Sequence, residues 1–264
     1  MGQDFVKTDE FLNTLESEKD RVWIFLDTET LGFNANKHQL TEVAAKATKI
    51  NNNKFEELCY YHEKSKLLSI TRRRLDYPYR GKGMSYRDIM KMTNYGEPIK
   101  NRQYVEEKQI LQDFLSFINR FEDPILVAHN ASFDIGFLNK RYNVYYENKN
   151  PFDDYEVVDT LKIMKKYFAP LIATESRRFN HRWLSAEERQ HITITRKIRS
   201  QLQKKKTKKL SLKLGEVANS LDLSSEGWHT AKNDVEILIS TIHKITELFI
   251  CSAGRELYSE KHLL

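Results

Sequence analysis

Strand-like segments dominate the first quarter of the chain. Residues 21–26 contain an apolar run at 22–26 that is rich in β-branched and aromatic side chains, which is typical of a buried strand. Residues 39–49 alternate, with Leu40 and Glu42 on one face and Val43 on the other, and Glu42 is expected to face solvent. Residues 54–61 predict a third strand, so the three together indicate an antiparallel meander.

Short strands and helical patterns alternate in the second half of the chain. The helical segments repeat apolar side chains at steps of three and four residues. Because strands alternate with helices here, we expect parallel pairing. The expected order is a helix at 106–121, a strand at 124–128, a helix carrying Ile135, Leu138 and Tyr142, a strand at 155–158, and helices at 161–168, 214–221 and 232–251.

Two segments fall outside this alternation. A short helix is expected within the first eighteen residues, with Phe11, Leu12 and Leu15 on one side. Between residues 169 and 209 the periodicity is lost, and large apolar side chains are few. We interpret this stretch as an insertion and not as a domain, because forty residues of this composition bury little core.

Composition excludes several classes of protein. The chain has 264 residues, 40% of them apolar, which is sufficient for a packed core. No apolar run approaches the roughly 18 residues of a membrane-spanning helix, and residues 1–21 lack the apolar stretch of a secretory signal. Cys59 and Cys251 are far apart in sequence, which argues against a disulfide framework. We expect a cytoplasmic or nucleoid-associated protein, or an intracellular protein of the host if it is viral, that is neither secreted nor in a membrane.

Positive charge is concentrated in one segment. The whole chain carries 43 Lys and Arg against 37 Asp and Glu, whereas residues 171–210 carry twelve Lys and Arg against three Glu. A smaller basic cluster at residues 71–88 is interleaved with Tyr77, Tyr79 and Tyr86. Cations bind phosphates and aromatic rings stack on bases, so both segments fit a single-stranded nucleic acid, although a solvated charged face has the same composition.

Carboxylates occupy positions where a metal site could form. Asp27 and Glu29 follow the first strand, and a two-residue step directs both side chains to one side of the sheet. Like charges held this close favour a hard divalent cation such as Mg²⁺ or Mn²⁺. A solvated strand end would give the same pattern.

Two further acids begin helices. Asp134 follows the strand at 124–128, at a junction where open α/β sheets place their ligands, although a helix cap fits equally. Asp234 lies in the first turn of the strongest helix, where the helix dipole also favours an acid. His229 lies on the loop just before that helix, and it is either part of the same cleft or a surface residue.

Taken in order, these motifs resemble a known family. They resemble the motifs of the DEDD, DnaQ-like 3′–5′ exonucleases of the ribonuclease H-like superfamily. The segments that carry the resemblance are Asp27-Thr28-Glu29-Thr30, His129-Asn130 with Phe133-Asp134, Val158-Asp159-Thr160, and His229 five residues before Asp234. The histidine branch fits, because the tyrosine branch needs Tyr where Thr230 stands. The resemblance is strongest to exonucleases of the proofreading-subunit type.

The resemblance implies a fold and a set of domain boundaries. It implies an α/β, ribonuclease H-like mixed five-stranded sheet, with an antiparallel meander followed by parallel strands, flanked by helices. We expect an N-terminal extension at residues 1–20, an exonuclease domain at 21–251 with a basic insertion at 171–210 before the last two helices, and a C-terminal tail at 252–264.

The resemblance also implies roles for individual residues. The four acids Asp27, Glu29, Asp134 and Asp234 would hold two divalent metal ions, Mg²⁺ or Mn²⁺, and His229 would accept the proton of the attacking water. Residues expected to contact the terminal nucleotide are Thr28, Thr30, Leu31, His129, Asn130 and Phe133.

The insertion is expected to clamp nucleic acid behind the 3′ terminus, through Lys204, Lys205, Lys206, Lys208 and Lys209. The expected substrate is a single-stranded, frayed or mismatched DNA 3′ end. The alternatives are an RNA-trimming exonuclease, a proofreading or repair enzyme that acts with a DNA polymerase, and an inactive nucleic-acid-binding module.

Overall fold

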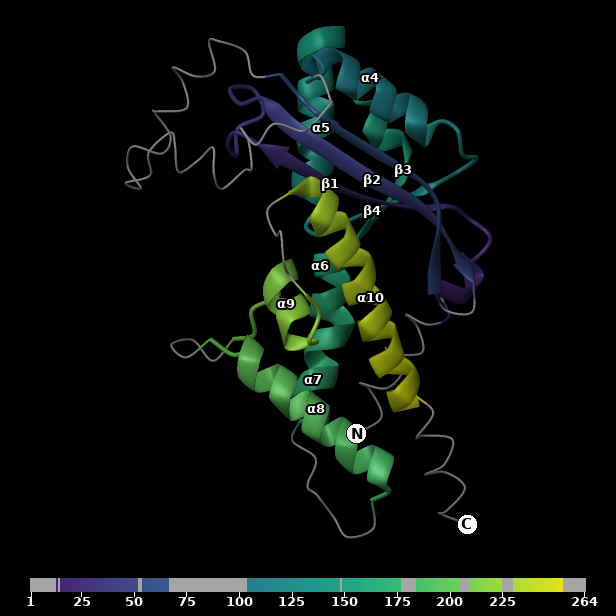
Figure 1. The fold of residues 1–264 in the computed structure, drawn as a ribbon, viewed down its shortest axis with the longest axis vertical. Coiled ribbons are helices and arrows are strands. Elements are labelled where there is room, and N and C mark those ends of the chain that lie inside the picture. The colour runs from purple at the N-terminus through teal and green to yellow at the C-terminus, as the bar shows by residue number, and fades with distance from the viewer. Residues whose placement is uncertain are drawn as a thin grey trace.

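A mixed five-stranded sheet lies at the centre of the molecule (Figure 1). The strand order is β3-β2-β1-β4-β5, with β1, β2 and β3 antiparallel and β1, β4 and β5 parallel. This arrangement confirms the predicted meander followed by parallel strands. The strands are β1 (Trp23–Thr30), β2 (Leu40–Asn51), β3 (Lys54–Lys64), β4 (Ile125–Ala128) and β5 (Glu156–Asp159). The computed structural model describes residues 13, 15–51, 54–66, 104–147, 149–176, 184–204, 209–224 and 230–253.

Helices bury both faces of the sheet. On β1, Ile24 and Leu26 point to one face and Trp23 and Phe25 to the other, and all four are buried. The first pair packs with α4 (Glu107–Ile118) and α5 (Ala131–Tyr146). The second pair packs under α10 (Ala231–Ala253), which crosses the opposite face in Figure 1. This double burial explains why residues 22–26 form an unbroken apolar run.

β1 continues further than its apolar run. The sequence predicted a strand end at residue 26, but pairing with β2 extends the strand to Thr30, with a shift in register after Glu29. The main-chain hydrogen bonds of β2 maintain the extended conformation of these polar residues. Asp27 and Glu29 therefore lie within a strand that is paired on one side.

The segment between residues 169 and 209 contains two helices that the sequence did not predict. Figure 1 shows them beyond the end of the sheet, next to α9. Ile198 and Leu202 of α8 are buried in the same core as the α10 face of the sheet, so the segment contributes more core than expected. A capping box of Ser185 and Glu188 begins α8. The remaining helices are η2 (Pro151–Asp154), α6 (Thr160–Ile163), η3 (Met164–Phe168), α7 (Ala169–Glu175), α8 (Ala186–Leu202) and α9 (Leu214–Ser220).

Few residues of the expected N-terminal helix are described. Residues 13 and 15–17 are helical, and Leu15 is buried in the core below α10. The basic cluster at 71–88 and the tail at 254–264 lie outside the described residues. Within the described part of the chain, none of the helices combines the length and the apolar character needed to span a bilayer.

Candidate active site

Four carboxylates meet at one end of the sheet. Asp27 and Glu29 project from β1, and Asp234 comes from the first turn of α10, which crosses the same face. Carboxylate oxygens of Asp27, Glu29 and Asp234 all lie within 4.8 Å of one another. Three such oxygens from rigid elements fit a hard divalent cation. We refer to these three residues together with Asp134 as the acid cluster.

Asp134 joins the cluster from α5 and is held by Thr28. Its Oδ1 accepts hydrogen bonds from the backbone N–H of Thr28 at 3.1 Å and from the Thr28 hydroxyl at 2.7 Å. Both residues are buried. The Thr28 hydroxyl therefore positions an acid, and its expected contact with a nucleotide stays a prediction. The second oxygen of Asp134 remains for the cluster.

Burial and mutual repulsion disfavour ionisation of these acids. Burial, and after it the nearby charges of Asp234 and Glu42, raise the pKa of Glu29 to about 8. Burial also raises the pKa of Asp134 to about 7 against the lowering effect of its Thr28 hydrogen bonds. The pKa of Asp27 lies well above its usual range because of burial and then because of Asp134. A divalent cation would reverse this penalty, so the donor set fits a metal.

In the absence of metal, we expect stability to fall as pH rises from about 5 to 8. The pKa of Glu29 is about 8 in the folded protein but about 4.3 in an unfolded chain. Between these values the unfolded chain loses a proton that the folded protein keeps, so increasing pH favours unfolding. Thermal denaturation in EDTA at several pH values measures this slope. Glu29→Gln should flatten it, and an unchanged slope in that variant would contradict the assignment.

His129 connects three segments beside the cluster. Its Nε2 donates to the Leu212 carbonyl at 2.9 Å, and its Nδ1 lies 3.1 Å from the Thr160 hydroxyl. Burial lowers the pKa of this imidazole. With both ring nitrogens engaged, His129 fixes the chain before α9 against the end of β4. The geometry therefore favours a bracing role over the predicted nucleotide contact.

Asp159 organises the neighbouring junction. Its Oδ1 accepts from the backbone N–H groups of Leu161 at 3.0 Å, Lys162 at 3.4 Å and Asn130 at 3.1 Å. Asn130 itself has a left-handed backbone with φ of 69° and an exposed side chain. Asp159 thus caps α6 and holds the turn into α5, while the Asn130 side chain is accessible to a ligand.

The loop after β1 presents an aromatic side chain that sequence analysis missed. Leu31, expected to contact base or sugar, is fully buried, whereas Phe33 is 82% exposed. The Phe33 ring lies edge-on to Phe133 at 6.2 Å between centroids. An aromatic residue four positions after Glu29, in a polar loop, was the available signal. The remaining predicted contact, Thr30, donates its hydroxyl to the Gly32 carbonyl at 3.0 Å.

Glu42 was predicted wrongly to face solvent. It is 2% exposed, lies directly opposite Glu29 on β2, and pairs with His62 at 2.7 Å and Lys64 at 3.4 Å. Because β2 is an inner strand with helices on both sides of the sheet, both of its alternating faces are covered. Glu42 therefore adds negative charge beside the acid cluster, and the Lys64 ammonium and the His62 imidazole pair with it.

The two described ends of the lysine-rich segment pair with each other. The Lys204 backbone N–H donates to the Lys209 carbonyl at 2.9 Å, and a bridge joins Gln203 to Leu210. Two residues later the chain reaches Leu212, which His129 holds. Lys204 and Lys209 therefore lie side by side, and the chain that follows them is fixed to the end of β4 by His129. His229, Lys205, Lys206 and Lys208 lie outside the described residues.

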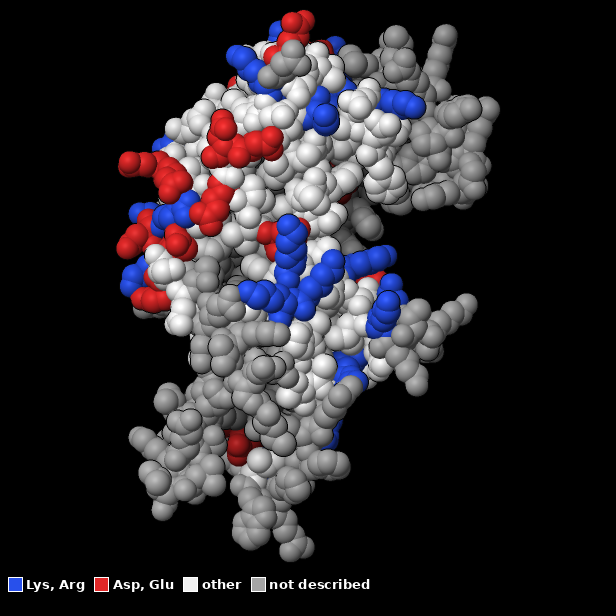
Figure 2. Space-filling model, turned by 180° about the vertical axis from the view of Figure 1, so that it is seen from behind, with Lys and Arg blue, Asp and Glu red and all other residues white. Residues whose placement is uncertain are grey.

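Other lysines lie on the same side of the molecule. Figure 2 shows Lys and Arg side chains gathered across the middle of one face, at the height of α6 and α9 in Figure 1. Lys165 is near enough to His129 to lower the pKa of its imidazole. The elements at this height also carry Lys162, Lys166 and Lys213.

Comparisons with known proteins point to one family. The Exonuclease (RNase_T) family model matches residues 87–191. The DNA polymerase III epsilon subunit of Buchnera aphidicola is 36% identical over 67 residues, 25% of this chain and 28% of that protein. The PolC-type DNA polymerase III of Halalkalibacterium halodurans is 32% identical over 152 residues, 54% of this chain and 8% of that protein. Ribonuclease T of Histophilus somni is 26% identical over 154 residues, 52% of this chain and 61% of that protein.

A solved structure extends the similarity of the fold. Exonuclease I of E. coli in complex with a dT13 oligonucleotide has a TM-score of 0.56 at 15% identity, covering 91% of this chain and 43% of that one. In each comparison the chain spans less than two thirds of the relative. The family model, the relatives and the sheet order agree with the acidic motifs. The chain is therefore similar to the DEDD, DnaQ-like 3′–5′ exonucleases in its family match at residues 87–191, in its relatives and in its fold.

Proposed function

We propose that this protein is a metal-dependent 3′–5′ exonuclease that releases nucleoside 5′-monophosphates from single-stranded DNA. The observation that carries the proposal is the acid cluster, in which two half-buried carboxylates from β1 and the buried carboxylate of Asp234 from α10 converge within 4.8 Å. Such a cluster repels phosphate unless a cation is present, so a purely nucleic-acid-binding role does not account for it.

In this proposal, the acid cluster holds the metal and the chain positions the reacting groups. Two divalent ions bound there would activate the attacking water and stabilise the leaving oxygen. Thr28 fixes Asp134 through two hydrogen bonds, and α10 fixes Asp234 in its first turn. His229, on the loop before α10, is proposed as the proton acceptor, since an imidazole titrates near neutral pH.

Aromatic and basic groups beside the cluster support a single-stranded substrate. The exposed Phe33 and the half-buried Phe133 offer ring faces to an unpaired base. The lysine-rich loop and the lysines near His129 supply positive charge for the phosphates that follow.

RNA is the second candidate substrate. The similarity to ribonuclease T favours RNA as the substrate. A partnership with a DNA polymerase is a further proposal, supported by the similarity to polymerase III proteins.

Replacing the five lysines of the loop should weaken binding of single-stranded DNA and flatten its salt dependence. The residues are Lys204, Lys205, Lys206, Lys208 and Lys209, all changed to Ala. For every lysine–phosphate ion pair that the substitutions remove, the slope of log affinity against log salt should fall by about 0.7. A control with the same charge change carries Lys19, Lys49, Lys54, Lys108 and Lys244 as Ala. If the two variants show equal salt slopes, the lysine-rich loop does not clamp the strand.

A time course with 5′-labelled oligonucleotides tests the proposed function. Matched single strands of DNA and RNA are incubated with Mg²⁺, with Mn²⁺ and with EDTA. We expect a ladder that shortens from the 3′ end, requires metal, and forms faster with DNA. A faster RNA ladder would make RNA the substrate. Absence of cleavage, together with binding that EDTA does not alter, would instead favour the inactive binding module.

A further inference from the structure

A line of accessible residues runs along α5 away from the acid cluster. Phe133, Gly136, Lys140 and Val144 follow one another at steps of three and four, so they share one face of the helix, and Glu147 continues the line directly after the helix ends at Tyr146. Gly136 and the three residues after it in this line are exposed, and a Cβ built on Gly136 meets nothing within 4 Å. Because Gly136 has no side chain, the surface of the helix is open at this position, between the Phe33–Phe133 pair and Lys140.

The loop after β1 forms the second wall of this line. At one end Phe33 contacts Phe133. Further along, the Ala35 carbonyl accepts a hydrogen bond from the Arg141 guanidinium at 3.1 Å. Loop and helix therefore run side by side, held together at both points. Between them, past Ala35, lies an open cavity of about 400 Å³ lined by Asn36, Lys140, Asn143, Val144 and Glu147.

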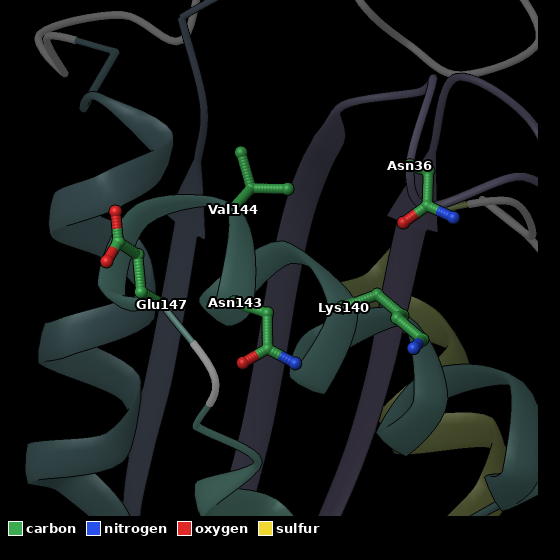
Figure 3. Close-up of a pocket in the computed structure, with 5 residues that line it drawn as sticks. All are labelled: Asn36, Lys140, Asn143, Val144 and Glu147. Carbon is green, nitrogen blue, oxygen red and sulfur yellow. The ribbon is translucent and has the colours of Figure 1, made fainter.

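The lining of the cavity combines several kinds of contact. Figure 3 shows Asn36 on the loop facing Lys140 on α5, with Asn143 further along the helix and Glu147 just after its end. Lys140 offers a cation for a phosphate, and the amides of Asn36 and Asn143 can pair with base edges. Val144, 51% exposed, offers an apolar surface, and Glu147 can accept from an amino group. With one cation and one anion, the cavity is not a simple phosphate site.

We propose that this trough, from Phe33 and Phe133 to the cavity at Lys140, binds the substrate strand upstream of the 3′-terminal nucleotide. The proposal rests on the proposed function and assigns a further subsite to it. Seven residues of helix separate Phe133 from Lys140, a distance of about 10 Å. A stacked strand rises about 3.4 Å per nucleotide, so the cavity would receive the nucleotide roughly three positions from the end.

A series of single strands from two to ten nucleotides long, with the same 3′ end, tests the trough. For the wild-type protein, kcat/KM should rise with length until the cavity is filled, at about four nucleotides. Gly136→Leu places a side chain on the floor of the trough, and leucine favours helix over glycine, so the fold is retained. This variant should lose about tenfold in kcat/KM on long strands and little on dinucleotides. Gly136→Ala adds only a Cβ and is the matched control.

A second variant tests the cavity by charge. Lys140→Gln should raise KM for long strands by about three- to tenfold, leave kcat unchanged, and reduce the salt slope of binding by about 0.7. Lys244→Gln, an equal change on the exposed side of α10, is the control. Equal losses at all lengths, or no loss in either variant, would overturn the trough.

Failure of the trough and failure of the proposed function give different results. If the wild-type protein releases no nucleotide from any strand, the proposed function fails. Binding can then still be followed by fluorescence anisotropy of labelled strands with the Asp27→Asn protein as background. In that case, the trough is supported if affinity increases with strand length and this increase disappears in Gly136→Leu. The trough is contradicted if the increase persists in that variant.

Discussion

Asp27→Asn should reduce the release of nucleotides by at least about 1000-fold, corresponding to about 4 kcal/mol of lost transition-state stabilisation. Asp27 lies within the group of carboxylate oxygens that converge inside 4.8 Å, and its substitution removes a charge that no neighbour can replace. The change conserves the size of the side chain. The measurement is single-turnover hydrolysis of a 5′-labelled strand at saturating Mn²⁺.

The control and the effect on binding make this test specific. Asp20→Asn, an identical substitution at an exposed position, should leave the rate unchanged. Affinity for single-stranded DNA in EDTA should be equal or higher in Asp27→Asn, because asparagine carries no charge, whereas Asp27 repels phosphate to the extent that it is ionised without metal. A rate within tenfold of the wild type would show that the chemistry takes place elsewhere.

Arg141→Met should destabilise the protein by about 3 to 5 kcal/mol. The Arg141 guanidinium donates to both carboxylate oxygens of Glu107 at 2.7 Å, and both side chains are buried. Glu107 also accepts from the Leu40 backbone at 2.8 Å and from the Tyr145 hydroxyl at 2.8 Å. The substitution would leave a buried carboxylate without its cation, which is the costly case for a buried ion pair.

Thermal and chemical denaturation measure this destabilisation. At about 2 to 4 °C per kcal/mol, the melting temperature should fall by roughly 10 °C. Arg120→Met, which removes an exposed guanidinium lying over Phe117, should cost less than about 1 kcal/mol. A destabilisation below about 1 kcal/mol for Arg141→Met would mean that the pair does not anchor the loop after β1 to α4 and α5.

The sheet was predictable from the sequence because its strands have unambiguous patterns. The continuous apolar run at residues 22–26 indicated a strand buried on both faces. The short apolar segment at residues 124–128, just before His129, indicated the parallel neighbour of that strand. The alternation on β2 correctly predicted a strand but misplaced Glu42, because alternation cannot show that both faces are covered. Whether the second face of a strand is buried depends on helices that are distant in sequence.

The helix α8 was not predictable in the same way. Its buried positions include His191 and Thr195 as well as Ile192, Ile198 and Leu202, so the buried stripe is partly polar. The intervening residues are mostly charged or polar, which hides the period of 3.6. The helix is stabilised by tertiary packing and by its capping box more than by its own composition.

The site was predictable in its spacing but not in its hydrogen bonds. A step of two on a strand placed Asp27 and Glu29 together, and the family resemblance added Asp134 and Asp234. The hydrogen bonds of Thr28 to Asp134 arise only from the docking of α5 against β1, which no local pattern encodes.

The measurement that tests the central claim most directly is hydrolysis of single-stranded DNA in ¹⁸O-labelled water with Mn²⁺. The account predicts nucleoside 5′-monophosphates that carry ¹⁸O in the phosphate, released singly from the 3′ end, and no such products from Asp27→Asn. Products that bear a 3′-phosphate, or equal labelled release from Asp27→Asn, would contradict attack by a water molecule bound at the acid cluster.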